Sequence, residues 1–175
     1  MVIRRLVSSD ASAFQSLRLE GLRLSASAFG SSYEEECDTP LSTIEARFAP
    51  DSGRNMFGAF DGDELVGIVG VGRETALKVR HKAYVRAMYV TQTHRGKGLG
   101  RLLMEHALAF AATMEGVQRM TISVTAGNAE AIGLYESLGF VEFGREPDSM
   151  IVDGEFYDEI TMSRALAAKP PAGTD

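Results

Sequence analysis

Hydrophobic residues alternate with polar ones, or run together, in seven short stretches of the chain. Such stretches predict β-strands, because successive side chains of a strand point to its two opposite faces. The segment Asp61–Glu64 has the composition of a hairpin connection, so the strands on either side of it are expected to pair antiparallel. The predicted strands cover residues 2–6, 55–60, 65–71, 83–90, 119–125, 140–145 and 155–162.

Two helices are predicted in the first third of the chain, where hydrophobic residues recur every three to four positions. The first helix follows Ser8, Ser9 and Asp10, whose side chains suit a helix start. Its hydrophobic side is expected to contain Phe14, Leu17, Leu22 and Leu24. The second, shorter helix spans 41–48, with Thr39 and Pro40 at its start and Pro50 just beyond its end.

Two further helices are predicted in the second half of the chain. One begins at residue 99, and its buried stripe is expected to contain Leu99, Leu102, Leu103, His106, Phe110 and Met114. Because His106 lies on that stripe, we interpret it as a core or boundary residue and not as a catalyst. The other helix covers residues 129–138 and ends at Gly139.

The order of these elements predicts an α+β fold, in which helices cover a mixed and mostly antiparallel sheet. Strict alternation on the strand 83–90 would place Tyr84, Arg86, Met88 and Val90 on one face and Val85, Ala87 and Tyr89 on the other. We expect a single domain over residues 1–165. Residues 166–175 contain too little apolar surface to dock and are expected to form a disordered tail.

Composition narrows the class of protein. The 175 residues include one cysteine, Cys37, and contain neither a signal-peptide pattern nor 18 consecutive apolar residues, so we expect a soluble, cytoplasmic protein without a membrane partner. The net charge is −6, yet residues 73–101 hold 8 basic and 1 acidic side chains. A short basic segment in an acidic chain favours a small polyanionic ligand over nucleic acid.

A glycine-rich turn lies inside this basic segment, between a predicted strand and a predicted helix. Gly96, Gly98 and Gly100 allow positive φ angles and a close approach of main-chain N–H groups to a ligand, and the helix start adds unpaired donors. The turn therefore suits a phosphate or pyrophosphate. Arg101 occupies the place of the third glycine of a dinucleotide-binding fingerprint, and no Gly-Lys-Ser/Thr follows as in a P-loop.

Two motifs resemble those of the GNAT family of N-acetyltransferases. The segment 95–100 matches the pattern Gln/Arg-x-x-Gly-x-Gly/Ala of the family's pyrophosphate loop. The segment 128–140 matches the later pattern Asn-x-x-Ala-x-x-Leu-Tyr-x-x-x-Gly-Phe at every fixed position. The resemblance spans about residues 2–164. It implies the family's α+β fold and an N-acetyltransferase that uses acetyl-coenzyme A as co-substrate.

The resemblance also implies roles for particular residues. Tyr135 would be the acid that protonates the departing thiolate, the N–H group of Val90 would polarise the thioester carbonyl, and Asn128 would cap its helix and contact pantetheine or phosphate. No metal ligands are implied. The remaining cofactor contacts would come from the main chain of Met88 and Tyr89, from the main-chain amides of Arg95, Gly96, Lys97, Gly98, Leu99 and Gly100, and from the charges of Arg95, Lys97 and Arg101.

The acceptor amine must lose a proton during acetyl transfer, and the chain departs from the family pattern at the residue that would accept this proton. Many relatives carry a glutamate about six residues before the Val90 position, where this chain has Tyr84. An ordered water chain would also remove the proton of the amine, and an acceptor amine of low pKa would be largely neutral without a base. Arg86 on the same strand suggests an acceptor with a carboxylate or phosphate. The carboxylates left as candidates are Glu34, Glu35, Glu36, Glu155 and Asp158.

Three functions remain open at this stage. The first is acetyl transfer to a primary amine of a small molecule or peptide by direct attack in a ternary complex. The second, suggested by the missing glutamate, is a non-catalytic module that binds or senses acyl-coenzyme A. The third is a nucleotide-binding regulator. The oligomeric state is left open, although the family often forms homodimers through its C-terminal strands.

Overall fold

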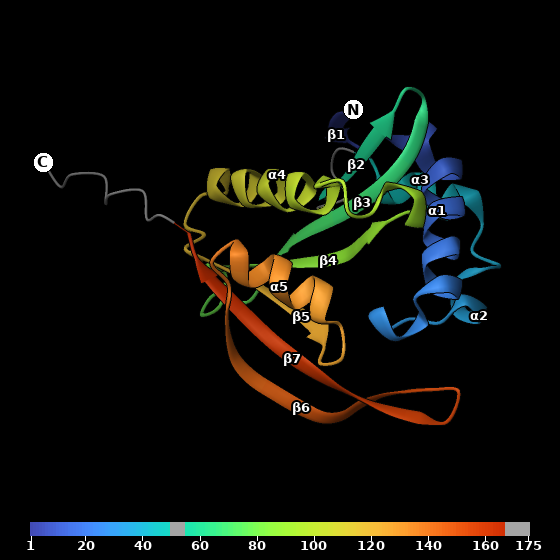
Figure 1. Cartoon of the computed structure of the whole chain (residues 1–175). Coiled ribbons are helices and arrows are strands. Elements are labelled where there is room, and N and C mark those ends of the chain that lie inside the picture. Colours follow the sequence, from blue (N-terminus) through green and yellow to red (C-terminus); the bar gives the residue numbers. More distant parts are fainter. Residues whose placement is uncertain (50–54, 167–175) are drawn as a thin grey trace, which may run out of the picture.

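Seven strands form one sheet in the order β1-β2-β3-β4-β5-β7-β6 (Figure 1). The computed structural model describes residues 1–49 and 55–166. Neighbouring strands pair antiparallel except β4 and β5, which are parallel, so the predicted mixed and mostly antiparallel sheet is confirmed. The strands are β1 (Val2–Arg5), β2 (Asn55–Asp61), β3 (Glu64–Arg73), β4 (Lys82–Val90), β5 (Arg119–Thr125), β6 (Val141–Val152) and β7 (Glu155–Ala165).

Helices cover both faces of the sheet (Figure 1). Buried side chains form two clusters, which we call the α4 cluster and the α1 cluster after the main helix in each. In β3, Val69 packs in the α4 cluster and Ile68 in the α1 cluster, which explains why this strand is apolar along nearly its whole length. The helices are α1 (Ala11–Leu24), α2 (Tyr33–Glu36), α3 (Leu41–Arg47), α4 (Leu99–Thr113) and α5 (Ala129–Ser137), with short turns η1 (Ser8–Asp10), η2 (Ala26–Ala28) and η3 (Gln92–His94).

The predicted hydrophobic sides of the two long helices need two corrections. Leu24, the last residue of α1, is 55% exposed, and Leu102 is 47% exposed on the outer side of α4. His106 is partly buried, and the centroids of its ring and the Phe57 ring lie 4.7 Å apart in an edge-type contact, which confirms a boundary position. The stripe of α4 that is buried consists of Leu99, Leu103, Met104, Ala107, Leu108 and Ala111.

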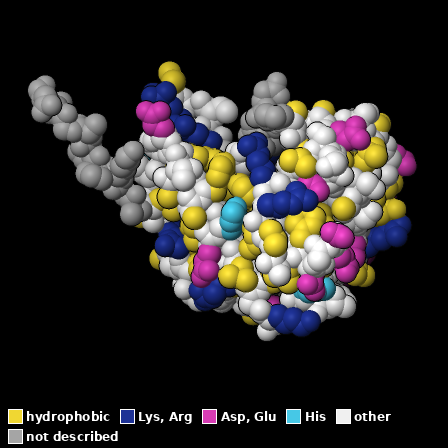
Figure 2. Space-filling view, turned by 90° about the horizontal axis from the view of Figure 1, so that it is seen from above, with side chains coloured by type: hydrophobic (Ala, Val, Ile, Leu, Met, Phe, Trp, Pro, Cys, Tyr) yellow, Lys and Arg dark blue, Asp and Glu magenta, His cyan; other side chains and the backbone are white. Residues whose placement is uncertain are grey.

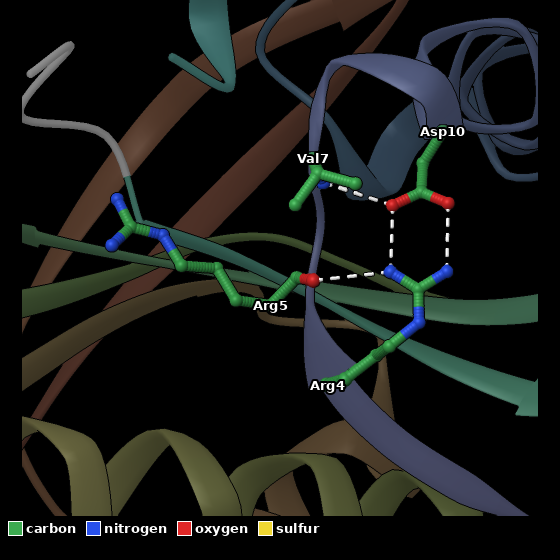
Figure 3. A network of polar contacts seen from close by, with 4 residues as sticks. All are labelled: Arg4, Arg5, Val7 and Asp10. Carbon is green, nitrogen blue, oxygen red and sulfur yellow. Dashed lines mark hydrogen bonds and ion pairs between the residues drawn. The ribbon is translucent and has the colours of Figure 1, made fainter. Parts of the chain in front are cut away.

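The start of α1 is held by an ion pair with β1 (Figure 3). Two nitrogens of Arg4 contact the two carboxylate oxygens of Asp10 at 2.7 and 2.8 Å, and the N–H of Val7 donates to the same carboxylate at 2.8 Å. Hydrogen bonding from Arg4 lowers the pKa of the Asp10 carboxyl. Asp10 thus fixes the chain just before α1, close to where the sequence predicted a helix start.

A bulge in β4 overturns the predicted alternation of its side chains. The pairing register shifts between Ile68–Tyr89 and Gly70–Arg86, and Ala87 adopts a φ of 51°. The extra residue reverses the faces beyond Arg86. Val85 and Val90 therefore lie in the same α4 cluster, Met88 packs against it, and Ala87 and Tyr89 turn to the α1 cluster.

The bulge is followed by a separation of β4 from β5. These parallel strands pair only where Lys82–Tyr84 lie beside Arg119–Thr121. On its other side β5 pairs with β7 through all seven of its residues, including those beyond Thr121. The two strands thus part in the middle of the sheet.

The C-terminal strands are longer than predicted, and Gly139 has the positive φ of 83° expected after α5. Leu166, which we placed in the tail, is buried in the α4 cluster, whereas residues 167–175 and Pro50 lie outside the described residues. Among residues 1–49 and 55–166, no helix is long and apolar enough to cross a membrane. The cytoplasmic location stays a prediction. Charged side chains of both signs are interspersed with hydrophobic ones on the face shown in Figure 2.

Candidate active site

The gap between β4 and β5 holds a cleft of about 410 Å³. One wall is the second half of β4, and the opposite wall is β5 from Ile122 onward together with the start of α5. The glycine-rich turn 95–98, the first turn of α4, η2 and Phe29 complete the lining. The separation of two parallel strands therefore creates a concave site beside both predicted motifs.

Eleven of the twelve predicted site residues line this cleft. Lys97 is the exception, since it is exposed and lies outside the lining. The structure thus brings together two motifs that are about thirty residues apart in the sequence. The lining residues are Met88, Tyr89, Val90, Arg95, Gly96, Gly98, Leu99, Gly100, Arg101, Asn128 and Tyr135.

The glycines of the turn have different physical roles. Gly96 and Gly98 adopt φ angles of 70° and 80°, which other residues rarely adopt, although a Cβ would meet no atom within 4 Å at either position. At Gly100 a Cβ would lie 3.3 Å from Leu134 Cδ2, so its small size allows α4 and α5 to approach closely. The first α-helical bond of α4 runs from Leu102 N–H to Gly98 O. The N–H groups ahead of it are available for an anion.

The two arginines of the turn also have protein partners. Arg95 donates through Nε to the main-chain oxygen of Val90 at 3.0 Å and through Nη2 to Ser25 Oγ at 3.3 Å. Arg101 donates to Ser137 Oγ at 2.7 Å, which ties α4 to α5. Both therefore brace the cleft, and the phosphate contacts predicted for their charges stay predictions.

The main chain of Val90 borders the open side of β4. Thr91 N–H donates to Val66 O on β3 at 3.0 Å. Because N–H groups of successive strand residues point in opposite directions, the N–H of Val90 points away from β3 and toward the gap. This orientation suits the contact with a thioester carbonyl that the resemblance implies.

Tyr135 reaches the cleft from α5 and is 5% exposed. The centroids of its ring and the Phe140 ring lie 6.1 Å apart. Burial raises the pKa of the Tyr135 hydroxyl to about 12. The phenol is therefore neutral across the pH range in which proteins work and can donate a proton. On the same helix, Asn128 Oδ1 accepts from Ala131 N–H at 3.1 Å, so its predicted capping role is confirmed.

A second pocket, of about 580 Å³, adjoins the cleft on the side away from the glycine turn. The cleft and the second pocket share the wall residues Ala28, Phe29, Val85, Arg86, Ala87, Ile122 and Ser123. The ionisable side chains that line the second pocket are Arg18, Glu36, Arg47, Tyr84, Arg86 and Glu159.

Of the five predicted base candidates, Glu36 alone lines the second pocket. Burial would raise the pKa of Glu36, but hydrogen bonds and charge from Arg18 outweigh burial and lower it, which makes this carboxylate a weak base. Asp158 is bound by Asp148 N–H and by Arg145, and its pKa is lowered as well. Glu34, Glu35 and Glu155 are exposed.

Glu159 is the pocket carboxylate that sequence reasoning missed. Burial, followed by the nearby charge of Glu146, raises the pKa of its carboxyl, while a hydrogen bond with Ser149 lowers it. Asp158 and Glu159 are neighbours on β7, so their side chains point to opposite faces of the sheet. Only the position of β7 in the sheet tells which of these two side chains points into the pocket.

A mixed seven-stranded sheet that is split between two parallel strands, with a glycine turn and a helix start at one end of the split, defines the fold class of the acyl-coenzyme A N-acyltransferases. Residues 20–140 match the sequence model of the Acetyltransferase (GNAT) family, and the chain belongs to this family.

Curated relatives match shorter segments. The chain is 26% identical over 96 residues to the spermidine N(1)-acetyltransferase of Vibrio cholerae, covering 55% of this chain and 56% of the relative. It is 41% identical over 88 residues to the L-methionine sulfoximine/L-methionine sulfone acetyltransferase of Pseudomonas aeruginosa, covering 50% and 48%. The chain spans about half the length of the curated relatives it matches.

Solved structures match nearly the whole chain. An acetyltransferase of the GNAT family from Streptococcus pneumoniae superposes with a TM-score of 0.83 at 22% identity, covering 94% of this chain and 98% of that one, and shows the shared fold. The structure of yncA from Salmonella typhimurium with its cofactor acetyl-CoA superposes with a TM-score of 0.82 at 25% identity, covering 100% and 98%.

Proposed function

We propose that this protein is an acetyl-coenzyme A dependent N-acetyltransferase that acts by direct attack of an amine within a ternary complex. One observation carries the proposal: the glycine turn, the second half of β4 and Tyr135 all line a single cleft. The bound acetyl-CoA in the yncA structure supports acetyl-coenzyme A as the co-substrate. The acceptor is an amine of a small molecule or a peptide.

The cofactor contacts follow the cleft from one end to the other. The main-chain N–H groups of residues 95–101 bind the pyrophosphate, with charge-assisted hydrogen bonds of about 1.5–3 kcal/mol each. The main chain of Met88 and Tyr89 contacts the pantetheine arm in the gap left by β5. The N–H of Val90 donates to the thioester oxygen and stabilises the negative charge that develops on it.

A protonated amine loses two protons in the reaction, and the sulfur gains one. As the amine nitrogen bonds to the acetyl carbon, the bond from that carbon to sulfur breaks, Tyr135 gives its proton to the departing thiolate, and the second proton lost by the nitrogen returns to the Tyr135 oxygen. The amine must lose a proton before attack, which costs about 4.6 kcal/mol at neutral pH for a lysine-like pKa near 10.4. We assign that proton to Glu159, directly or through water, because the raised pKa makes its carboxylate a better base than an ordinary one.

Replacing Tyr135 with Phe tests the proposal. Release of free thiol from acetyl-coenzyme A over a panel of amines should fall by ~10²-fold or more, because the thiolate then has no acid. Calorimetry should show unchanged binding of acetyl-coenzyme A. A loss of less than about threefold would remove Tyr135 from the mechanism.

A second candidate function is a module that binds acyl-coenzyme A without turnover. The observation in its favour is Tyr84, which stands in the second pocket where many relatives carry the glutamate. This module would bind acetyl-coenzyme A and release no thiol with any amine, before and after Tyr135→Phe. A nucleotide-binding regulator would instead bind ATP or NAD as tightly as acetyl-coenzyme A in calorimetry.

We further propose that two copies pair through the β6–β7 hairpin. This hairpin forms the edge of the sheet and exposes Val141, Phe143, Ile151 and Phe156. Exposed apolar side chains on an edge strand favour association with another chain. Sedimentation equilibrium should give the mass of a dimer, and Phe143→Asp should shift it toward the monomer. A monomer at every concentration of the unchanged protein would contradict the pairing.

A further inference from the structure

We propose that the segment 25–29 limits the size of the acyl group that the protein transfers, with the Phe29 ring as the stop that admits acetyl and excludes longer chains. The segment comprises Ser25, η2 and Phe29, and we call it the strap. This inference rests on the proposed acetyl transfer, because it assigns the residue that selects the acyl donor of that reaction. Three features of the structure support it: the bonds that attach the strap, the residues common to the cleft and the second pocket, and the packing of Phe29.

The strap is attached to both sides of the gap between β4 and β5. On one side, Ser25 Oγ accepts a hydrogen bond at 3.3 Å from Nη2 of Arg95, on the turn that follows β4. On the other side, the hydroxyl of Thr125, the last residue of β5, donates to the main-chain oxygen of Ser27. In Figure 1 the chain that follows α1 lies beside the end of β5. The strap therefore bridges the two strands where the sheet is open.

The cleft and the second pocket meet on opposite faces of the sheet. Tyr135 lines the cleft and packs in the α4 cluster, whereas Phe29 lines both spaces and packs in the α1 cluster. An amine that enters through the second pocket reaches the thioester from the α1 side, opposite to the acid proposed to protonate the sulfur. The acyl chain extends from the thioester carbon away from that sulfur. It therefore points away from Tyr135 and toward the strap.

The junction of the two spaces is mostly apolar. Five of the seven residues that line both of them are apolar, so the junction suits a hydrocarbon group. The bulge of β4 contributes to this, because it turns the Ala87 side chain into the same α1 cluster as Phe29. The five apolar residues are Ala28, Phe29, Val85, Ala87 and Ile122.

The Phe29 ring is held in place from several directions. Phe29 is 9% exposed, and the centroid of its ring lies 6.1 Å from that of Tyr89. The Arg18 guanidinium lies 4.5 Å from the centre of the ring and is itself held by both carboxylate oxygens of Glu36, at 2.7 and 3.1 Å. Because close-packed side chains resist displacement, a chain longer than acetyl cannot push the ring aside without breaking these contacts. Phe29 therefore acts as a fixed stop.

A series of acyl donors tests the limit in the intact protein. Thiol release is measured with acetyl-, propionyl-, butyryl- and hexanoyl-coenzyme A, with one amine that the protein accepts. A fixed apolar pocket discriminates strongly against added methylenes, so kcat/KM should fall by about 10-fold or more from acetyl to butyryl. Equal values of kcat/KM for the four donors would overturn the proposal.

Phe29→Leu locates the stop, because leucine removes the ring and keeps an apolar side chain in the core. The ratio of kcat/KM for butyryl to that for acetyl should rise by about 10-fold or more. Phe48→Leu is the matched control, since Phe48 is a buried phenylalanine of the same α1 cluster that lines the second pocket and not the cleft. This control should keep the donor ratio of the unchanged protein. An unchanged ratio in Phe29→Leu, or an equal rise in Phe48→Leu, would contradict the role of Phe29.

Ala28→Val tests the limit in the opposite direction and leaves the core intact, because Ala28 is exposed and lines both spaces. The ratio of kcat/KM for propionyl to that for acetyl should fall by about 10-fold. Ala26→Val, in the same turn and outside both linings, is the control and should keep the ratio. A propionyl ratio that does not fall in Ala28→Val would show that the strap does not border the acyl group.

Calorimetry without an amine separates this inference from the proposed function. Butyryl-coenzyme A should bind the unchanged protein about 10-fold or more weakly than acetyl-coenzyme A, and Phe29→Leu should remove this difference. If no amine releases thiol, acetyl transfer has failed, yet this pattern of affinities would still support the stop. If butyryl-coenzyme A binds as tightly as acetyl-coenzyme A, the stop is wrong, whether or not transfer occurs.

Discussion

The guanidinium of Arg95 donates to the main-chain oxygen of Val90, with 3.0 Å between Nε and O. This bond folds the glycine turn back onto the end of β4. It joins the segment proposed to hold the pyrophosphate to the residue proposed to polarise the thioester. Tyr89 contributes to the same arrangement, because its ring lies 5.4 Å from the Arg95 guanidinium and its hydroxyl donates to Glu20 on α1 at 2.9 Å.

Arg95→Gln should weaken binding of acetyl-coenzyme A by about 10-fold and lower the free energy of unfolding by about 1 kcal/mol, because the turn loses its bond to β4. Arg95→Lys separates geometry from charge, since lysine keeps the charge and lacks the planar fork. Equal losses in both variants would show that Arg95 acts by positioning the turn. Calorimetry gives the affinities, and Arg119→Gln, which removes an exposed arginine bound to Ser163, is the control.

Gly98→Ala should destabilise the protein by about 1–2 kcal/mol, because alanine is strained at a φ of 80°. The strain also displaces the main-chain donors at the start of α4, so the dissociation constant of acetyl-coenzyme A should rise. Gly133→Ala is a sharp control, because Gly133 lies inside α5 with no atom within 4 Å of an added Cβ. That change should stabilise the protein by about 0.5–1 kcal/mol. Urea unfolding measures both, and equal effects would contradict the role given to φ.

The sequence was sufficient for the strands and the four longer helices, although not for the short helix α2, and for the cofactor side of the cleft. Strand and helix positions follow from local periodicity, and the glycine turn and the segment 128–140 carry their chemistry in consecutive residues. Eleven of the twelve predicted site residues therefore lie along one cleft, with Lys97 outside it. Local patterns suffice here because the turn, the helix start and the open strand edge are each formed by a short piece of chain.

The second pocket could not be predicted in the same way. A bulge at Ala87 reversed the faces of β4, and no sequence periodicity marks one extra residue in a strand. Arg18 and Glu159 come from opposite ends of the chain, and they share the pocket only because β7 inserts between β5 and β6. Periodicity also predicted burial where there is none. Leu102 stands at helical spacing but faces solvent, and smaller residues such as Ala107 and Ala111 fill the buried stripe of α4 instead.

Asp10→Asn should lower the free energy of unfolding at neutral pH by about 1–3 kcal/mol, because the Arg4 guanidinium loses its charged partner. Hydrogen bonding from Arg4 lowers the pKa of Asp10 in the folded protein. Its stabilisation is therefore present above the unfolded pKa and is lost as the pH falls through the folded pKa. In urea unfolding, the free energies of unfolding of the unchanged protein and of Asp10→Asn should converge at acidic pH. Asp63→Asn in the exposed β2–β3 turn is the control, and a gap that is the same at every pH would contradict the ion-pair explanation.

Glu159→Gln should lower the rate of acetyl transfer by ~10²-fold if this carboxylate accepts the proton of the amine. Burial and then the charge of Glu146 raise the pKa of Glu159, so in the unchanged protein kcat/KM should fall on the acid side at a pH above the usual glutamate range. Glu146→Gln removes one cause of that shift. In that variant the fall of kcat/KM on the acid side should move to lower pH, with most of the activity kept.

The stability of the same variant separates a proton acceptor from a structural residue. A carboxyl whose pKa is raised by folding stabilises the protein below its unfolded pKa, and this contribution is lost as the pH rises through the folded pKa. At neutral pH the Glu159 carboxylate therefore disfavours folding, and Glu159→Gln should unfold at the same or a higher urea concentration. Lost activity in a protein that is no less stable would identify Glu159 as the base. Lost activity together with lost stability would mean that the change disturbed the junction of β5 and β7 instead.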